Sequence, residues 1–389
     1  MPAESLEPAG PAAGWYRSPS LVGAIDDEPT RRLIADGIIR LAAEAGLSAP
    51  ARDGRLDRVA DDLARLNPQK HLPSFELVAF LLTHYGVVEP EPQMRYGIVD
   101  PRAPANFVEL AGPRLVEQLK EIRRPRLGVG LALLGDELAV VVALQPQKLE
   151  LGPVPRALAP GLVAHMEGRL LPGYQIPKVL VTFENGTVDD VRVQGTAARF
   201  QAALGCRNDR RGVMQVEIAA EGPRGPDVLA IFPVFCAVDP PARSPALALE
   251  TGGAVEPEAV EKRLLELVNR DRARQGLGLV RMDSRLVDVA RAHSREMADT
   301  GVVSHVSPRT GNVRDRVLRA RLDVALLGEN VGQDYSAAGA HRSFMSSPGH
   351  RGNVVDPNMT AVGIGVVKGR ERSDPVSLYI TEIFAAGLQ

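Results

Sequence analysis

The chain has 389 residues, of which 44% are hydrophobic and 24% charged, and its formal net charge is −2. This length favours about two to three domains of ordinary globular composition. The near-neutral charge argues against nucleic acid or an acidic membrane as a partner. Aromatic residues make up 4% of the chain, which argues against a stacking surface for bases or sugars. No run reaches the roughly 18 apolar residues of a membrane helix, so no transmembrane segment is predicted.

Residues 1–25 are predicted to be a disordered leader. The first twenty, MPAESLEPAGPAAGWYRSPS, include two glutamates and no apolar segment, so no signal peptide is visible as written. Either the protein is cytosolic, or its true start lies upstream, or the chain was trimmed. Cys206 and Cys236 are compatible with one disulfide, which would favour an oxidising compartment, and equally with two buried thiols.

The hydrophobic pattern changes twice along the chain. Residues 26–150 are predicted to be mainly helical and to end in a β-hairpin around Gly135-Asp136. From 151 to 240 the period is 2, and Asn185-Gly186 is a strong hairpin signal, which predicts a small β-sandwich. A linker rich in proline, glycine and small residues spans 241–258. The helical pattern then returns in a last domain, 259–389.

The two helical regions are similar to each other. GLSAPARDGRLDRVA at 46–60 aligns without a gap with GLGLVRMDSRLVDVA at 276–290, at an offset of 230. LGVGLAL at 127–133 resembles VGIGVVK at 362–368, at an offset of 235. Chance matching between helices rich in alanine, leucine and arginine is the alternative. The ungapped run favours two copies of one unit with the β-domain between them.

Four motifs follow one another in the last 130 residues, and a fifth segment closes the series. They are VVSHVSP (302–308), LLGENVG (326–332), SFMSSPGHRGNV (343–354), TAVGIGVV (360–367) and LYITEIF (378–384). With these motifs, residues 256–386 resemble the CAP superfamily, which comprises cysteine-rich secretory proteins, antigen 5 and pathogenesis-related 1 proteins. The bacterial secreted type is the most similar. The resemblance implies an α-β-α sandwich, and the whole chain is then an α+β protein whose residues 26–150 form a degenerate CAP-like domain.

The resemblance also implies a shallow cleft with two histidines and two acidic residues. His305 and His350 match the two histidines, and Glu329 matches the glutamate of the Gly-Glu-Asn motif. The second acidic residue is expected three positions after the aromatic residue of the preceding helix. That aromatic is Phe344 here, and the third position after it is Ser347. The tetrad is therefore reduced to three, which puts in doubt any mechanism that needs both carboxylates.

The chemistry of these residue types is consistent with a metal site. Two neutral imidazoles bind a divalent ion such as zinc when water completes the shell. A carboxylate orients an imidazole or holds a metal-bound water. Single histidines are more often structural, and the spacing of His305 and His350 is less specific than an HExxH motif. Pro348 and Gly349 are expected to form a rigid turn that points His350 into the cleft opposite His305.

Three functions remain open. The preferred one is a secreted, periplasmic or cell-envelope binding module whose cleft holds a divalent metal or a small ligand. Its partners are an unidentified protein, a lipid or a cell-envelope component. The second is a metal-dependent hydrolase of peptides or cell-wall material with Glu329 as the general base. The third is a purely structural interaction protein. The first copy holds Phe75 and Leu115 at the two histidine positions, and is predicted to have lost the site.

Overall fold

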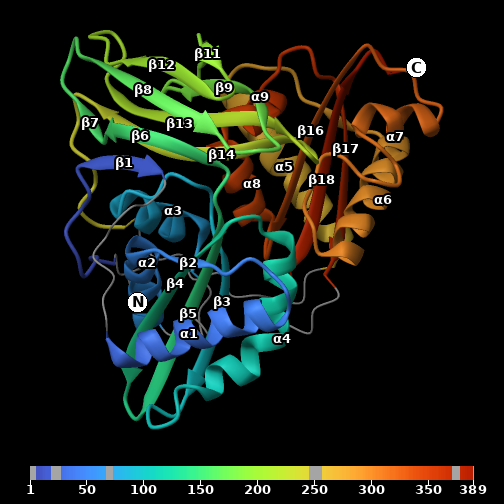
Figure 1. Cartoon of the computed structure of the whole chain (residues 1–389). Coiled ribbons are helices and arrows are strands. Elements are labelled where there is room, and N and C mark those ends of the chain that lie inside the picture. The colour runs from blue at the N-terminus through green and yellow to red at the C-terminus, as the bar shows by residue number, and fades with distance from the viewer. Residues whose placement is uncertain (1–5, 19–27, 67–72, 245–255, 370–376, 389) are drawn as a thin grey trace. The chain divides into compact units, whose positions relative to one another are not determined.

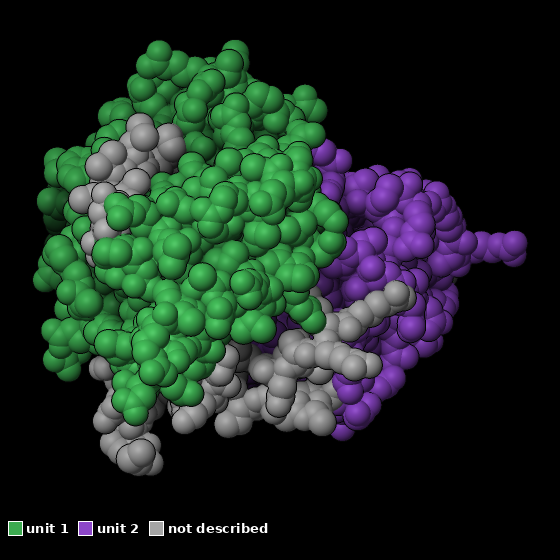
Figure 2. Space-filling model, turned by 60° about the horizontal axis from the view of Figure 1, so that its bottom comes forward, with its two compact units in different colours: residues 1–220, 228–250 green, residues 221–227, 251–389 purple. Residues whose placement is uncertain are grey.

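The computed structural model describes residues 6–18, 28–66, 73–244, 256–369 and 377–388, and the protein is an α+β structure with several mixed sheets (Figure 1). It divides into two compact units, which Figure 2 colours separately. The first unit comprises residues 1–220 and 228–250. The second comprises residues 221–227 and 251–389. Within the described residues, no helix combines the length and apolar character needed to cross a membrane.

The N-terminal part of the first unit alternates helices with the strands of one sheet. Its elements are α1 (Pro29–Glu44), β2 (Ala51–Arg52), α2 (Gly54–Arg65), α3 (Phe75–His84), β3 (Gln93–Val99), α4 (Asn106–Glu121), β4 (Pro125–Leu134) and β5 (Glu137–Pro146). The strand order is β2-β4-β5-β3, and the short β2 pairs in parallel with β4. The predicted hairpin is confirmed, because β4 and β5 pair in an antiparallel register and turn at Gly135, whose φ is +68°.

The β-rich part of the first unit consists of two five-stranded sheets. Its strands are β1 (Trp15–Ser18), β6 (Leu149–Pro155), β7 (Ala157–Leu158), β8 (Val163–Leu170), β9 (Gln175–Thr182), β10 (Val188–Val191), β11 (Gln194–Thr196), β12 (Arg199–Gly205), β13 (Gly212–Gly222) and β14 (Gly225–Cys236). The orders are β1-β6-β8-β12-β11 and β10-β9-β13-β14-β7. Strand β8 alternates strictly between exposed and buried residues, and side chains from both sheets form one hydrophobic core.

One sequence expectation for this region is wrong, and one open choice is resolved. The predicted disordered leader is wrong for residues 15–18, which form β1 and pair with β6. Tyr16 is fully buried, and its ring lies 4.9 Å from that of Phe232. Four residues are too few for an alternating pattern to be recognised in the sequence. Cys206 and Cys236 form a disulfide with their Cα atoms 5.2 Å apart, so the open choice is resolved in favour of the bond.

The second unit repeats the same arrangement of strands. Its helices and strands are α5 (Pro257–Arg274), β15 (Arg281–Met282), α6 (Ser284–Thr300), α7 (Val313–Arg319), β16 (Leu326–Asp334), α8 (Ala337–Ser346), α9 (Pro348–Val354), β17 (Ala361–Lys368) and β18 (Leu378–Ala386). The order is β15-β17-β18-β16, and the short β15 is parallel to β17. One hydrophobic cluster joins the sheet to α5, α8 and α9, and another joins it to α6 and α7, so helices cover both faces (Figure 1).

Glycines in β17 allow α6 to approach the sheet closely. A Cβ atom at Gly363 would overlap the carbonyl carbon of Leu286, and one at Gly365 would overlap the backbone nitrogen of Arg291. Ser294 on α6 uses this proximity to donate a hydrogen bond to the Gly365 carbonyl at 2.8 Å. The Gly-x-Gly sequence of β17 is thus a packing requirement of the helix above it.

We expect Gly365→Ala to destabilise the protein by roughly 2 kcal/mol or more, because the new methyl group meets backbone atoms that cannot move aside independently. Gly278→Ala is the matched control, since nothing lies within 4 Å of a Cβ atom there. The two variants are compared by urea unfolding. Equal stability of the two would show that α6 does not pack this closely.

Candidate functional site

The centre of the candidate site is a buried carboxylate held by two basic side chains. Glu329 lies on β16 and is 7% exposed. Its Oε2 atom is 2.9 Å from Nδ1 of His305, in the loop that follows α6. Its Oε1 atom accepts a hydrogen bond from Nη2 of Arg316 on α7. Both carboxylate oxygens are therefore engaged by protein groups, and the contact fixes the orientation of the His305 ring.

Arg316 also holds the loop that carries His305. Its Nη1 atom donates to the backbone carbonyls of His305 at 3.2 Å and Gly311 at 2.6 Å. Nε2 of His293 lies 2.8 Å from the Ser304 carbonyl, so the loop is held from α6 as well. Arg316 was not among the site residues predicted from the sequence. An arginine on a helix with other arginines carries no pattern that separates it from surface residues.

His350 lies in the first turn of a helix, and the expected rigid turn at Pro348-Gly349 is a helix start instead. Pro348 is the first residue of α9, a position where the missing N–H costs nothing. Ser347 is the N-cap, and its Oγ accepts the N–H of His350 at 3.3 Å. The residue at the expected second acidic position therefore starts the helix that presents His350.

The structure brings His305 and His350 together. Their ring centroids are 6.1 Å apart, and the Phe344 and His350 rings pack in a T-shaped contact at a centroid distance of 5.3 Å. Burial lowers the pKa of His350 to about 3, and the nearby His305 acts in the same direction. His350 is therefore neutral at ordinary pH, with its ring nitrogen lone pair available to a ligand.

The Gly-Glu-Asn motif joins β16 to α9. Nδ2 of Asn353 on α9 donates to the Glu329 carbonyl at 3.0 Å and to Oδ1 of Asn330 at 2.9 Å. A Cβ atom at Gly328 would lie 2.5 Å from Oδ1 of Asn353, so a side chain at this position would displace the Asn353 amide. The three residues of the motif thus serve different purposes. Gly328 leaves room for the Asn353 side chain, Glu329 contacts His305, and Asn330 links the strand to Asn353.

The residues fit a metal ion bound by two imidazoles and completed by water. Nδ1 of His305 is bonded to Glu329, which leaves Nε2 for a ligand. With metal–nitrogen bonds of about 2 Å, a ring separation of 6.1 Å is near the upper limit for two imidazoles that share one ion. No group of three or more histidine, cysteine, aspartate or glutamate side chains arranged to hold a metal occurs among the described residues. Glu329 is engaged by Arg316, so it supports His305 and does not complete a third ligand position.

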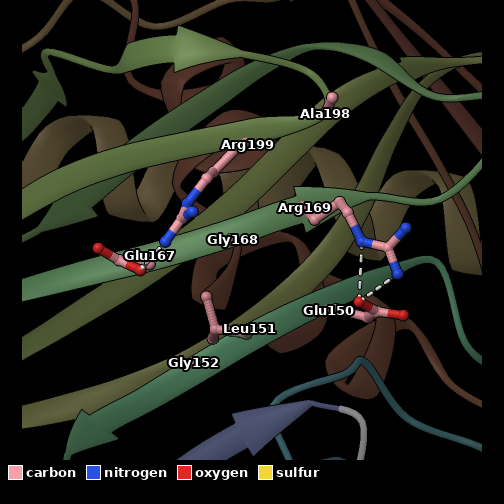
Figure 3. Close-up of a pocket in the computed structure, with 8 residues that line it drawn as sticks. All are labelled: Glu150, Leu151, Gly152, Glu167, Gly168, Arg169, Ala198 and Arg199. Carbon is pink, nitrogen blue, oxygen red and sulfur yellow. Dashed lines mark hydrogen bonds and ion pairs between the residues drawn. The ribbon is translucent and has the colours of Figure 1, made fainter.

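A separate hollow of about 360 Å³ lies on the first unit (Figure 3). It is lined by residues of β6 and β8 and by Ala198 and Arg199. Its charged side chains pair with one another: Nε of Arg169 is 2.9 Å from Glu150, and Nη2 of Arg199 is 3.2 Å from Glu167. None of the predicted site residues lines this hollow, and its paired charges are solvated on the outer face of the sheet.

Comparison with known proteins identifies the domain that carries the histidine site. The family model of the cysteine-rich secretory protein family, CAP, matches residues 265–384. This range contains His305, Glu329 and His350. Residues 265–384 form a CAP domain. The resemblance inferred from the motifs is thereby confirmed for the C-terminal part of the chain.

Two curated relatives from Bacillus subtilis match part of this chain. The chain is 32% identical to the protein YkwD over 132 residues, which cover 33% of this chain and 51% of YkwD. It is 33% identical to the membrane protein YlbC over 107 residues, which cover 27% of this chain and 31% of YlbC. The chain thus spans about half the length of YkwD and under a third of YlbC.

Solved structures of similar proteins include extracellular and secretory bacterial proteins. An extracellular protein with an SCP domain from Bacillus anthracis is 17% identical, covers 79% of this chain and 91% of its own, and has a TM-score of 0.31. A cysteine-rich secretory protein from Staphylococcus aureus is 12% identical, covers 67% and 85%, and has a TM-score of 0.26. These TM-scores are too low to add to the assignment of the CAP domain.

The pKa of His350 predicts how stability depends on pH. A folded-state pKa of about 3, below the usual 6.5, means that the contribution of His350 is present above pH 6.5 and is lost as the pH falls. Relative to His350→Gln, the wild type should lose up to about 1.4 kcal/mol of unfolding free energy per pH unit below that value. Urea unfolding of both proteins at several pH values measures the difference. A difference that stays constant with pH contradicts the burial of the neutral ring.

Proposed function

We propose that the protein is an exported bacterial CAP-domain protein whose C-terminal cleft binds a divalent metal ion through His305 and His350. The facing pair of imidazoles is the observation that carries the proposal. Glu329 would orient His305, and Arg316 would balance the charge of Glu329 and hold the loop. A bound ion would offer its open positions to water or to a small ligand as a Lewis acid.

Export is supported by the disulfide between Cys206 and Cys236, because disulfides persist in oxidising compartments. Two proteins of similar structure are described as extracellular or secretory, and one curated relative is named a membrane protein. We therefore place this protein outside the cytoplasm, secreted or at the cell envelope. Its ligand would be met there, as an unidentified protein, lipid or envelope component.

A hydrolase with Glu329 as general base is less well supported. A general base needs an oxygen within hydrogen-bond reach of the attacking water. Both oxygens of Glu329 already have partners in His305 and Arg316, and the second acidic position is the helix cap Ser347. A purely structural role does not account for a buried arginine–glutamate pair placed to orient a histidine.

We also propose that residues 26–150 are a second CAP-like unit that has lost the site. The two four-stranded sheets have the same strand order. Gly130 meets Ala60 on α2 in the same way that Gly365 meets α6, since a Cβ atom there would overlap the Ala60 carbonyl carbon. Leu115, at the position of His350, is fully buried in the core of its own unit, and α4 continues unbroken where the second unit divides into α8 and α9.

One ion pair supports this kinship although its charges are exchanged. Arg31 on α1 pairs with Asp61 on α2 at 3.1 Å. At an offset of 230, Glu261 on α5 pairs with Arg291 on α6, with Nε and Oε1 2.7 Å apart. In each unit the carboxylate also accepts a backbone N–H of the neighbouring strand, from Leu131 in the first and Val366 in the second. The ion pair joins equivalent helices in both units, but the arginine lies on the first helix in one unit and on the second helix in the other. Chance similarity of sequence does not explain such an exchange.

Zinc titration of the full chain by calorimetry tests the proposed site. We expect saturable binding in the wild type and a loss of at least about tenfold in affinity for the double variant His305→Ala/His350→Ala, because water alone then replaces the imidazoles. His165→Ala, which removes an exposed histidine on β8, is the control and should bind as the wild type does. Equal zinc binding by all three proteins, or none by the wild type, overturns the proposal.

Exchange of charges tests the kinship of the two units. Arg31→Glu should cost roughly 3 kcal/mol or more, because it leaves Asp61 partly buried beside a second carboxylate. Arg31→Glu/Asp61→Arg recreates the arrangement of the second unit and should recover most of that loss. Urea unfolding of the single and double variants gives the coupling free energy. A double variant no more stable than Arg31→Glu argues against equivalent positions.

A further inference from the structure

A second carboxylate of the CAP domain lies fully inside the protein, outside the contacts described so far. Glu382 on β18 has no exposed surface, and its register partners are Asn330 on β16 and Ile364 on β17. Its Oε2 atom accepts a hydrogen bond from Nδ2 of Asn330 at 3.0 Å. Its Oε1 atom is buried without a hydrogen-bond partner in the described part of the chain. Burial raises the pKa of Glu382 to about 7, so burying this carboxyl group in its charged form costs folding free energy.

The contacts form a chain from Glu382 to the helix of His350. Nδ2 of Asn330 donates to Glu382, so the oxygen of the same amide faces Asn353. Asn353 then presents its own Nδ2, which donates to Asn330 and to the Glu329 carbonyl. In the contact with Asn330, Glu382 is the acceptor. It therefore sets the direction of both amides, and with them the attachment of α9 to β16.

We propose that Glu382 is a positioning residue for the histidine site: through Asn330 and Asn353 it fixes α9, and hence His350, against the strand that carries Glu329. The proposal rests on the metal site proposed above. It adds Glu382, for which the described part of the chain shows no contact with His305 or His350. A buried glutamate that only filled the core would be replaced by leucine without harm.

The test compares Glu382→Leu with Glu382→Gln in the full chain, with zinc alone as the probe. Leucine removes the oxygen that accepts the hydrogen bond of Asn330, so the orientation of the Asn330 and Asn353 amides is no longer fixed. Zinc affinity should therefore fall about tenfold, as for other residues that orient a metal ligand. Glutamine still offers an oxygen to Asn330 and should restore the affinity to within about threefold. Glu382→Leu should unfold at the same or a higher urea concentration than the wild type. A core-filling role predicts instead that both variants bind zinc normally.

Thr381→Val is the matched control. Thr381 precedes Glu382 on β18, and its side chain bonds Ser294 on α6, on the face of the sheet away from α9. It should leave zinc affinity unchanged. Asn353→Ala removes the hydrogen bonds of Asn353 to Asn330 and to the Glu329 carbonyl. Its effect on zinc affinity should not add to that of Glu382→Leu. If Glu382→Leu does not fold, the zinc affinities of Asn353→Ala and Thr381→Val are compared instead. A lower affinity of Asn353→Ala supports the proposal, and equal affinities contradict it.

Nitrogen-15 NMR of the histidine rings separates this inference from the metal proposal. Glu382→Leu and Asn353→Ala should shift the ring signals of His350 without zinc, whereas Thr381→Val should not. If the wild type binds no zinc but Glu382→Leu and Asn353→Ala still shift the His350 signals, the metal site is overturned and the positioning role is supported. Wild-type zinc affinity and unshifted His350 signals in both variants overturn the positioning role.

Discussion

The buried carboxylate of Glu329 is the contact on which the histidine site depends. It lies between Arg316 and His305, so one side chain links β16, α7 and the loop after α6. A buried ion pair of this kind contributes little net stability, because desolvation offsets the attraction. It does impose geometry: a carboxylate with both oxygens engaged holds the imidazole in one orientation. The contacts of Glu329 therefore favour a role in orienting His305 over a role in proton transfer.

Close approach of helices to the sheet is the second constraint. Gly365 lets α6 lie against β17, and Gly328 lets Asn353 of α9 lie against β16. The two faces of β16 then carry different contacts. Glu329 points to the side of His305 and Arg316, and Asn330 points to Asn353 and Glu382. The histidines meet because both faces are fixed to the same strand.

The residues of the candidate site could be named from the sequence because they stand in short motifs that resemble those of the CAP family. His305, Glu329 and His350 come together as expected, and the CAP domain is confirmed. Arg316 and Glu382 could not be predicted in the same way. Each acts through a contact that depends on which face of a helix or strand it occupies after folding, and neither stands in a motif that marks this face. Strand β1 was missed for a related reason, since its pairing partner β6 lies more than 130 residues away.

The amino-acid sequence by itself determined the α+β class, the two hairpins, the similarity between the two helical regions and the candidate histidines, because local periodicity and short motifs carry these features. Tertiary structure decided the rest. It showed that Cys206 and Cys236 are bonded and that both oxygens of Glu329 are occupied. The disulfide and the two contacts of Glu329 join residues 13 to 30 positions apart in the chain, and such contacts form only once the sheets and helices have packed.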